Sequence, residues 1–440
     1  GGITELDGDI RFDIPIDPRW TIVAAYQHVG QDDAPRTHKT VHAVPFNGST
    51  VGSELRRDYN QRRDLGYVRA EFESDCGPIR SARLGVSIHR HWEERDRLRT
   101  RDREDLSGFK LYQYGVQYQM ENPSRIGDWT WGVDYYHDES DTWRRNFVDG
   151  IPTGESIQGP FGDEGRYDLL GAFVQDDIDF GRFDLILGGR FTYASAFAGR
   201  VENPADGSVM EVEDSWTNFA GSIRGIYTFN DCWNCYAGVS QAFRAPTLYD
   251  LTAFEATSVF ELPSPGLDPE QYLTAELGVK TQQQDLSGYA SVWHTWIDDS
   301  IVRSPTGEEF EDTPVVRKDN IGDGWMWGWE AELAYRFKRD FVAFGNLSWM
   351  EGKVDQIDEG AGRIVRTWVS RGKPLTSFLG LRYEPQGGCG WVQLEWAYSM
   401  MEDRLSLRDQ ADTSRIPPGG TPAWSTLSLR GGYQIGRHVY

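Results

Sequence analysis

Residues 240–280 read SQAFRAPTLYDLTAFEATSVFELPSPGLDPEQYLTAELGVK, and the rest of the chain repeats their plan. The stretch leaves a segment of alternating apolar and polar residues and opens a long loop on Phe243-Arg244-Ala245-Pro246. It then enters another alternating segment. Such alternation predicts a β-strand with one apolar face. A strand, a long loop, a strand and a tight turn recur in that order from end to end.

About seventeen segments share this period-two alternation. Most are roughly 10–14 residues long, whereas strands of globular proteins average ~5–6 residues and a tilted strand crosses a bilayer with ~9–11. The predicted strands are 9–16, 19–29, 64–74, 81–92, 108–121, 127–138, 166–179, 182–194, 215–229, 232–242, 272–282, 286–297, 325–337, 340–351, 374–384, 390–401 and 423–436.

The connections between these segments alternate between short and long. We expect long loops at 30–63, 93–107, 139–165, 195–214, 243–271, 298–324, 352–373 and 402–422. Outer-membrane barrels place short periplasmic turns at one end and long extracellular loops at the other. The sequence therefore predicts an all-β fold, a transmembrane antiparallel meander β-barrel.

Each strand has an apolar and a polar face. We predict that Leu185, Leu187, Ile223 and Leu394 face lipid, and that Arg190, Arg224, Glu330, Glu332 and Glu395 face the lumen. Charged residues in the middle of a strand suit a water-filled lumen better than a packed core.

Composition limits the classes of function that the chain can have. The chain has 440 residues and a net charge of −23, which argues against nucleic-acid binding because that needs a basic face. The 13% of aromatic residues fits two interfacial belts. Cys232 and Cys235 form a Cys-x-x-Cys in a predicted turn without a second ligand pair, so we expect a local disulfide or free thiols.

Several motifs resemble those of TonB-dependent outer-membrane receptors. They are the FRAP segment, Leu267, Pro269 and Glu270 followed by Glu276 and Gly278, FVQDD at 173–177 with LGGRF at 187–191, and NIG at 320–322 with GWEAE at 328–332. The resemblance implies a barrel of about 22 strands, of which this chain holds about 17–18. We expect residues 1–440 to form a single, incomplete barrel domain that lacks the family's plug domain and final strand.

The resemblance also implies a function. Such a receptor takes up a scarce ligand across the outer membrane, for example an iron–siderophore-like chelate, cobalamin or an oligosaccharide. Its partners are the TonB–ExbB–ExbD energy-transducing complex, the small-molecule ligand, and outer-membrane lipid and lipopolysaccharide. It is not an enzyme and needs no cofactor. A passive porin and an outer-membrane barrel enzyme are the alternatives, although no nucleophile motif is visible.

Two groups are candidate ligand-binding residues. The first lies in the long loop and combines aromatic and polar side chains suited to a mid-sized ligand: Phe243, Arg244, Pro246, Tyr249, Asp250, Phe254 and Phe260. Arg244 and Pro246 are also explained as a simple end of the strand. The second is His89 and His91, which share the lumen face and could ligate haem iron or a metal chelate, or be part of a polar wall.

Charge runs offer further alternatives. The run at 93–105, EERDRLRTRDRED, is either a solvated loop or a site for lipopolysaccharide phosphates. The carboxylate pairs Asp298-Asp299 and Glu308-Glu309 lack a calcium-loop pattern, and we expect them to be solvated.

Overall fold

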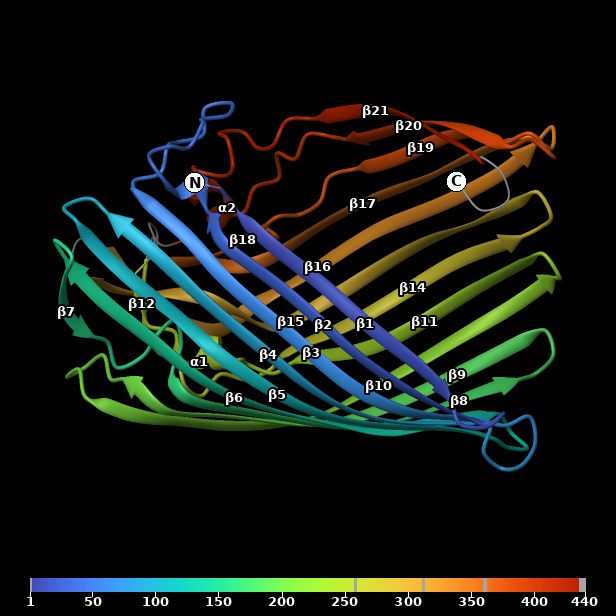
Figure 1. The fold of residues 1–440 in the computed structure, drawn as a ribbon, viewed down its shortest axis with the longest axis horizontal. Coiled ribbons are helices and arrows are strands. Elements are labelled where there is room, and N and C mark those ends of the chain that lie inside the picture. Colours follow the sequence, from blue (N-terminus) through green and yellow to red (C-terminus); the bar gives the residue numbers. More distant parts are fainter. Residues whose placement is uncertain (1, 257–258, 311–312, 359–361, 435–440) are drawn as a thin grey trace.

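One long, curved antiparallel sheet forms almost the whole protein (Figure 1). The computed structural model describes residues 2–256, 259–310, 313–358 and 362–434. The long strands are β1 (Thr4–Pro15), β2 (Trp20–Pro35), β3 (Arg56–Glu73), β4 (Ser81–Arg99), β5 (Arg103–Pro123), β6 (Asp128–Val148), β8 (Asp163–Asp179), β9 (Phe183–Glu202), β10 (Val209–Asn230), β11 (Trp233–Arg244), β14 (Glu270–Gln282), β15 (Leu286–Phe310), β16 (Thr313–Phe337), β17 (Phe341–Asp358), β19 (Thr376–Tyr383), β20 (Gly390–Ser399) and β21 (Trp424–Tyr433).

The remaining elements are short. They are the 3₁₀ turn η1 (Thr37–Lys39), strands β7 (Ile151–Glu155), β12 (Glu255–Ala256), β13 (Phe260–Glu261) and β18 (Arg363–Trp368), and helices α1 (Leu248–Thr252) and α2 (Leu407–Ala411). No helix in the described part of the chain is long and apolar enough to span a membrane. Every predicted strand overlaps one of the long strands, and the all-β meander is confirmed.

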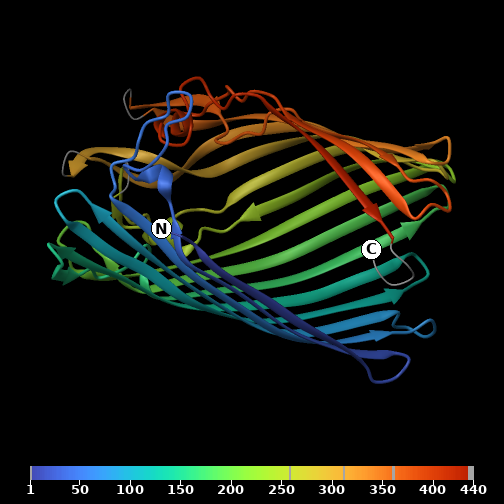
Figure 2. The same cartoon turned by 45° about the horizontal axis from the view of Figure 1, so that its top comes forward.

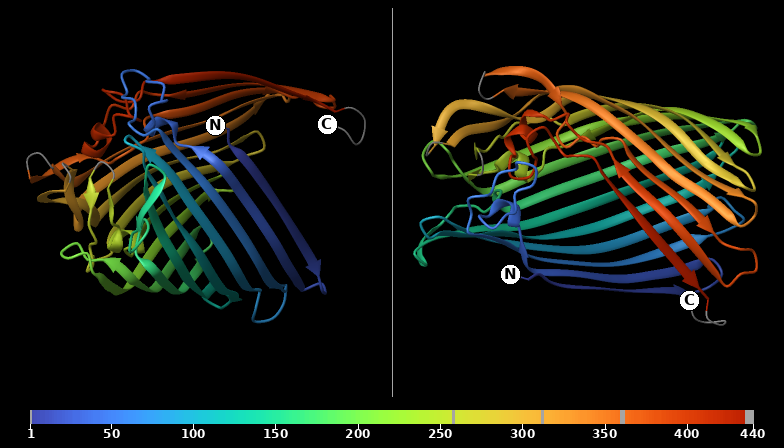
Figure 3. Two further views of the ribbon diagram at one scale, coloured as in Figure 1. Left: turned by 60° about the vertical axis from the view of Figure 1, so that its left-hand side comes forward. Right: turned by 90° about the horizontal axis from the view of Figure 1, so that it is seen from above.

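Each long strand pairs with the next one along the chain, and the sheet curves around a central space (Figures 2 and 3). Among the described residues, β1 pairs with β2 alone and β21 with β20 alone, so the sheet has two open edges. An unpaired edge exposes backbone N–H and C=O groups that lipid cannot satisfy.

The tight turns lie at one end of the sheet, which we call the turn end, and the long loops at the other, the loop end (Figure 1). Side-chain oxygens cap several tight turns. Asp17 accepts hydrogen bonds from the backbone N–H of Arg19 and Trp20, and Asn230 does the same for Cys232 and Trp233. Asp and Asn favour turns because their side chains bond to the backbone two residues on.

Cross-strand register confirms the predicted division into two faces. Ile223 lies opposite Leu187 and Val239, while Leu394 lies opposite Leu381 and Leu429. These side chains form an exposed apolar surface, which we call the outer face.

The predicted polar side chains lie on the other side of the sheet, the inner face. There Arg190 pairs with Asp134 at 2.7 Å, Arg224 lies 3.8 Å from Glu276, and Glu395 pairs with Arg430 at 3.1 Å. Ion pairs therefore line the inner face across neighbouring strands.

Six of the expected long loops contain more strand than expected, because strands reach into 30–63, 93–107, 139–165, 195–214, 298–324 and 352–373. Residues 298–324 were expected to be a loop, yet β15 and β16 continue through most of them as a hairpin. The segment 93–107 is likewise reduced to a short turn after Arg99, and β6, β9 and β10 reach into 139–165 and 195–214. Where a hairpin has polar residues on both faces, the apolar alternation that marks a strand disappears.

Candidate functional site

The loop after β11 folds inward at the loop end. Its helix α1 places Leu248 and Leu251 against Ala194, Ala196 and Ala198 of β9, all of which are buried. These alanines lie on the inner face, since Phe191 on the alternate positions is exposed. Small side chains there leave room for the helix, which lies within the curve of the strands (Figure 3). The long loop expected at 243–271 therefore packs on the inner face of the sheet.

Arg244 and Asp250 hold the start of this loop. The Arg244 guanidinium donates to Glu270 at 2.5 Å and to Asp250 at 2.7 Å. Thr247 and Asp250 form a reciprocal capping box that starts α1. Burial is the largest influence on the Asp250 carboxyl and raises its pKa, but Lys318, Arg244 and the backbone N–H of Thr247 together lower the pKa to about 2.

Two further cations tie the loop to β15 and β16. Lys318 Nζ lies 3.1 Å from Asp250 and 3.0 Å from Glu261, and Arg303 donates to Glu261 at 2.6 Å. Lys318 and Glu261 have side chains that are 9% and 2% exposed, so water screens this network little. Sequence reasoning missed Lys318, Arg303 and Glu261 because their partners are distant in the chain and carry no motif.

The other predicted loop residues divide into packed and accessible ones. Pro246 is fully buried, and its carbonyl accepts a hydrogen bond from Tyr167. Phe254 and Phe260 meet edge to face at 5.0 Å between ring centroids. Phe243 faces Gln271 in the strand register. Tyr249 is 37% exposed, and Lys318 Nζ lies 4.3 Å from its ring centroid. Tyr249 is therefore partly accessible to solvent, unlike Pro246.

His89 and His91 lie on the inner face of β4, where their rings stack at 6.3 Å. Arg63 donates to His89 at 3.4 Å, and His91 contacts Phe109 at 5.0 Å. Phe109 in turn contacts Phe161, which packs against the core beneath α1. Phe109 and Phe161 thus connect His91 to the core on which the α1 loop packs. In the described part of the chain, no group of three or more His, Cys, Asp or Glu could hold a metal ion.

The charged run at 93–105 is not a solvated loop. Asp105 is fully buried and receives Arg95 at 3.1 Å, Arg97 at 2.7 Å and Arg99 at 3.4 Å. Because Ile88 is exposed on the outer face, the odd-numbered arginines of β4 lie on the inner face. These inward positions do not suit contact with lipid phosphates. Cys232 and Cys235 are free thiols.

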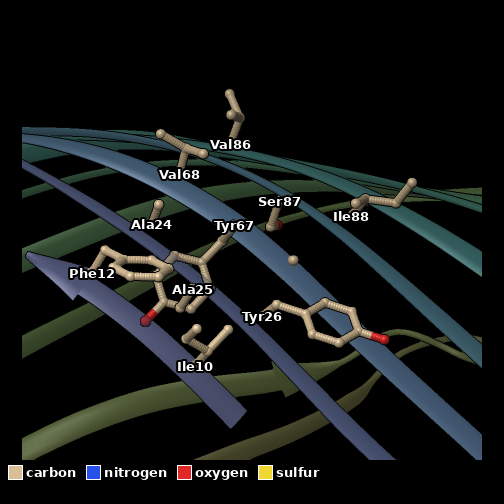
Figure 4. Close-up of a pocket in the computed structure, with 11 residues that line it drawn as sticks. Ile10, Phe12, Ala24, Ala25, Tyr26, Tyr67, Val68, Val86, Ser87 and Ile88 are labelled. Atoms are coloured by element: carbon tan, nitrogen blue, oxygen red, sulfur yellow. The ribbon is translucent and has the colours of Figure 1, made fainter.

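Two hollows mark the outer face. The first hollow has a volume of about 450 Å³ and lies over β1–β4 (Figure 4). It forms because Gly66 and Ala24 have small side chains, whereas their neighbours Phe12, Val68 and Ile88 have large ones. Another, of about 590 Å³, lies between Trp296, Trp325, Trp327, His294 and Arg366. The first is apolar and belongs to the exposed apolar belt; the second is aromatic and polar, as side chains at a membrane–water interface are.

A curved antiparallel meander with an apolar outer belt, tight turns at one end and long loops at the other is typical of outer-membrane β-barrels. The family model "TonB dependent receptor-like, beta-barrel" matches residues 6–439, and the chain belongs to that family. No curated protein matches the chain.

Solved structures of transporters and receptors share the fold. The copper transporter OprC superposes with a TM-score of 0.77 at 16% identity, covering 99% of this chain and 64% of that one. The ferric yersiniabactin uptake receptor FyuA from Yersinia pestis gives 0.70 at 14%, covering 98% and 63%. The ferric citrate transporter FecA gives 0.70 at 15%, covering 99% and 63%. The chain therefore spans less than two thirds of the length of these proteins.

Proposed function

We propose that the chain is the barrel of a receptor for energy-coupled uptake of a scarce ligand across a Gram-negative outer membrane. The ligand is an iron–siderophore-like chelate, cobalamin or an oligosaccharide, and the energy comes from the TonB–ExbB–ExbD complex. Family membership supports this class. The observation that carries the proposal is the inward-folded α1 loop, which places Tyr249 and a buried ion network at the mouth of the sheet. We assign the chain no catalytic role.

The exposed apolar belt supports insertion into a bilayer. Leu187, Ile223 and Leu394 are 39%, 51% and 44% exposed, and many large apolar side chains accompany them on the outer face. An apolar surface of that extent marks a membrane or protein interface. In this arrangement the outer face contacts lipid and lipopolysaccharide, and the loop end is extracellular.

The proposal includes a plug domain and further strands in addition to these 440 residues. Two observations support it: the chain covers 64% of OprC, and β1 and β21 each keep an open edge within the described residues. The plug would carry the contact with TonB.

Uptake of radioactive iron chelates and radioactive cobalamin by cells producing the intact receptor tests this function. We expect accumulation that stops when TonB is deleted or the proton gradient is collapsed. Deleting 247–260 should abolish high-affinity uptake while the barrel still inserts, because that loop holds the proposed contacts. Accumulation that continues without TonB would favour a passive porin and refute the proposal.

A further inference from the structure

The second hollow on the outer face, between β15 and β16, is walled by aromatic rings. Trp296 lies opposite Trp325 in the strand register, and His294 lies opposite Trp327. The ring centroids of His294 and Trp296 are 4.4 Å apart, and His294 stacks on Trp325 at 6.2 Å. Trp296 is 44% exposed, so the rings are accessible from outside the sheet. We call this space of about 590 Å³ the aromatic hollow.

Two carboxylates give the aromatic hollow an excess of negative charge. Asp298 and Asp323 line it, and both are exposed. Asp323 accepts a hydrogen bond from the backbone N–H of Asp299 at 3.3 Å, which fixes its side chain. The cation of the lining, Arg366, is already held by two hydrogen bonds to Asp355, one of them 2.7 Å long. Within the described residues, no ion pair neutralises Asp298 or Asp323.

The aromatic hollow lies where the exposed apolar belt ends. On the same two strands, nearer the turn end, Val292, Leu333 and Tyr335 are 43%, 52% and 47% exposed on the outer face. In a bilayer these side chains contact acyl chains, and Trp rings beside them lie at the level of the head groups. A lipid whose tails cover Val292 and Leu333 therefore places its head group at the aromatic hollow.

A neighbouring hollow of about 520 Å³ adjoins the aromatic hollow at Arg366, which lines both. Its lining also includes Lys353 and Trp368, and Lys353 Nζ lies 4.5 Å from the centroid of the Trp368 ring. In the part of the chain that the structure describes, Lys353 forms no ion pair. The two adjoining hollows thus differ in charge: carboxylates without a counter-ion line the first, and a lysine without one lines the second.

We propose that the aromatic hollow binds the ammonium group of a phosphoethanolamine lipid head group, whose phosphate lies beside Lys353. The inference rests on the proposed insertion into a membrane and adds a specific lipid to it. The face of an indole ring attracts a cation, and Trp does so more strongly than the other aromatic residues. Asp298 and Asp323 supply charge-assisted hydrogen-bond acceptors for the ammonium group. A phosphoglycerol head group has the phosphate but lacks the ammonium group that these residues would bind.

Native mass spectrometry of the intact receptor tests the site. The receptor is released from detergent micelles that contain equal amounts of phosphatidylethanolamine and phosphatidylglycerol, and the retained lipids are counted. We expect phosphatidylethanolamine to be retained at least fivefold more than phosphatidylglycerol. Asp298→Asn/Asp323→Asn should reduce its retention at least fivefold. Asp231→Asn/Asp285→Asn, in exposed tight turns at the turn end, is the matched control and should change retention less than twofold.

A second variant tests the rings separately from the carboxylates. Trp325→Leu keeps the wall apolar but removes the attraction for a cation, so it should also lower retention of phosphatidylethanolamine at least fivefold. Its control is Trp233→Leu, at an outer-face position at the turn end that is 38% exposed, with an expected change below twofold. Circular dichroism melting checks that each variant keeps the wild-type strands.

Equal retention of the two lipids by the wild type, or wild-type retention by Asp298→Asn/Asp323→Asn, overturns the site. Binding of pentalysine without retention of phosphatidylethanolamine would assign the aromatic hollow to a cationic protein partner and overturn the lipid. The proposed function is tested independently by energy-dependent uptake, which Asp298→Asn/Asp323→Asn should leave unchanged because both residues lie on the outer face. Absence of uptake in a wild type that retains phosphatidylethanolamine would refute the proposed function and leave this site standing.

Discussion

The two halves of the long strands differ in how apolar and charged side chains are distributed over their two faces. Toward the turn end, β9–β11 present apolar residues on the outer face and charged residues on the inner face. Toward the loop end, the β4–β5 hairpin carries charged residues on both faces, and its buried inner side is an Arg–Asp cluster. The first half is organised by the hydrophobic contrast between its two sides, and the second by ion pairs and by the α1 loop.

The difference lies in what surrounds each half. A strand with lipid on one side and water on the other must alternate, because a charge facing lipid is costly. A hairpin standing in water has no such constraint, and its stability comes from cross-strand pairs and from segments that pack on it. The inward-folded α1 loop is such a packed segment, and its Leu251 and Glu261 are both buried.

The largest effect is expected from the ion network that holds the α1 loop. Lys318→Met removes the buried cation that Asp250 and Glu261 share and leaves them with the more exposed Arg244 and Arg303. We therefore expect a cost of about 3 kcal/mol, the lower end of the range for a buried ion pair that loses one partner. We expect α1 to detach while the strands remain folded. Hydrogen exchange should rise over α1 and β13 and stay unchanged over β9–β11.

Lys280→Met is the matched control for that substitution. Lys280 is exposed, and its Nζ lies 5.2 Å from the centroid of the Tyr236 ring. It should leave α1 protected. Protection of α1 that survives Lys318→Met would contradict the view that ion pairs organise the loop end.

A smaller effect is expected on the outer face. Leu187→Arg puts a charge on the exposed apolar belt and should destabilise the folded protein in lipid by about 2–4 kcal/mol near the midplane. Arg224→Leu on the inner face removes a weak pair of 3.8 Å and should cost less than about 1 kcal/mol. Urea unfolding in vesicles, followed by tryptophan fluorescence, measures both. Equal costs would contradict the division into two faces.

Sequence alone predicted the turn-end half well, because alternation in segments such as 182–193 reports directly which side faces lipid. It also placed His89 and His91 on one face. It did not predict that Pro246 is buried or that Arg244 bridges Asp250 and Glu270, since these contacts depend on how a loop folds back over β9. The sequence also did not predict that Asp105 pairs with three arginines, because these residues meet only when β4 and β5 pair as a hairpin.

Acid should release the α1 loop without opening the sheet. Asp250 has its pKa lowered from 3.8 to about 2 in the folded protein, so its ionised form stabilises the docked loop at pH values above 3.8. That stabilisation, about 2 kcal/mol, is lost as the pH falls through about 2. We expect proteolysis in the α1 loop by an acid protease to increase between about pH 4 and pH 2. Asp250→Asn should abolish this pH dependence; a variant that keeps it would assign the titration to another carboxyl.

The smallest effect concerns α2, the five-residue helix Leu407–Ala411. Ser406 is fully buried and caps the helix, so Ser406→Ala should destabilise α2 by about 1 kcal/mol. A five-residue helix cannot persist on its own propensity, and the loss should appear as roughly fivefold faster hydrogen exchange of α2 amides. Ser425→Ala, on β21, removes a serine that caps nothing and should change exchange in α2 by less than twofold. If α2 exchanges at the wild-type rate in Ser406→Ala, then Asp409 holds the helix without its cap, and the loop end depends on charged contacts even more than the comparison of the two halves implies.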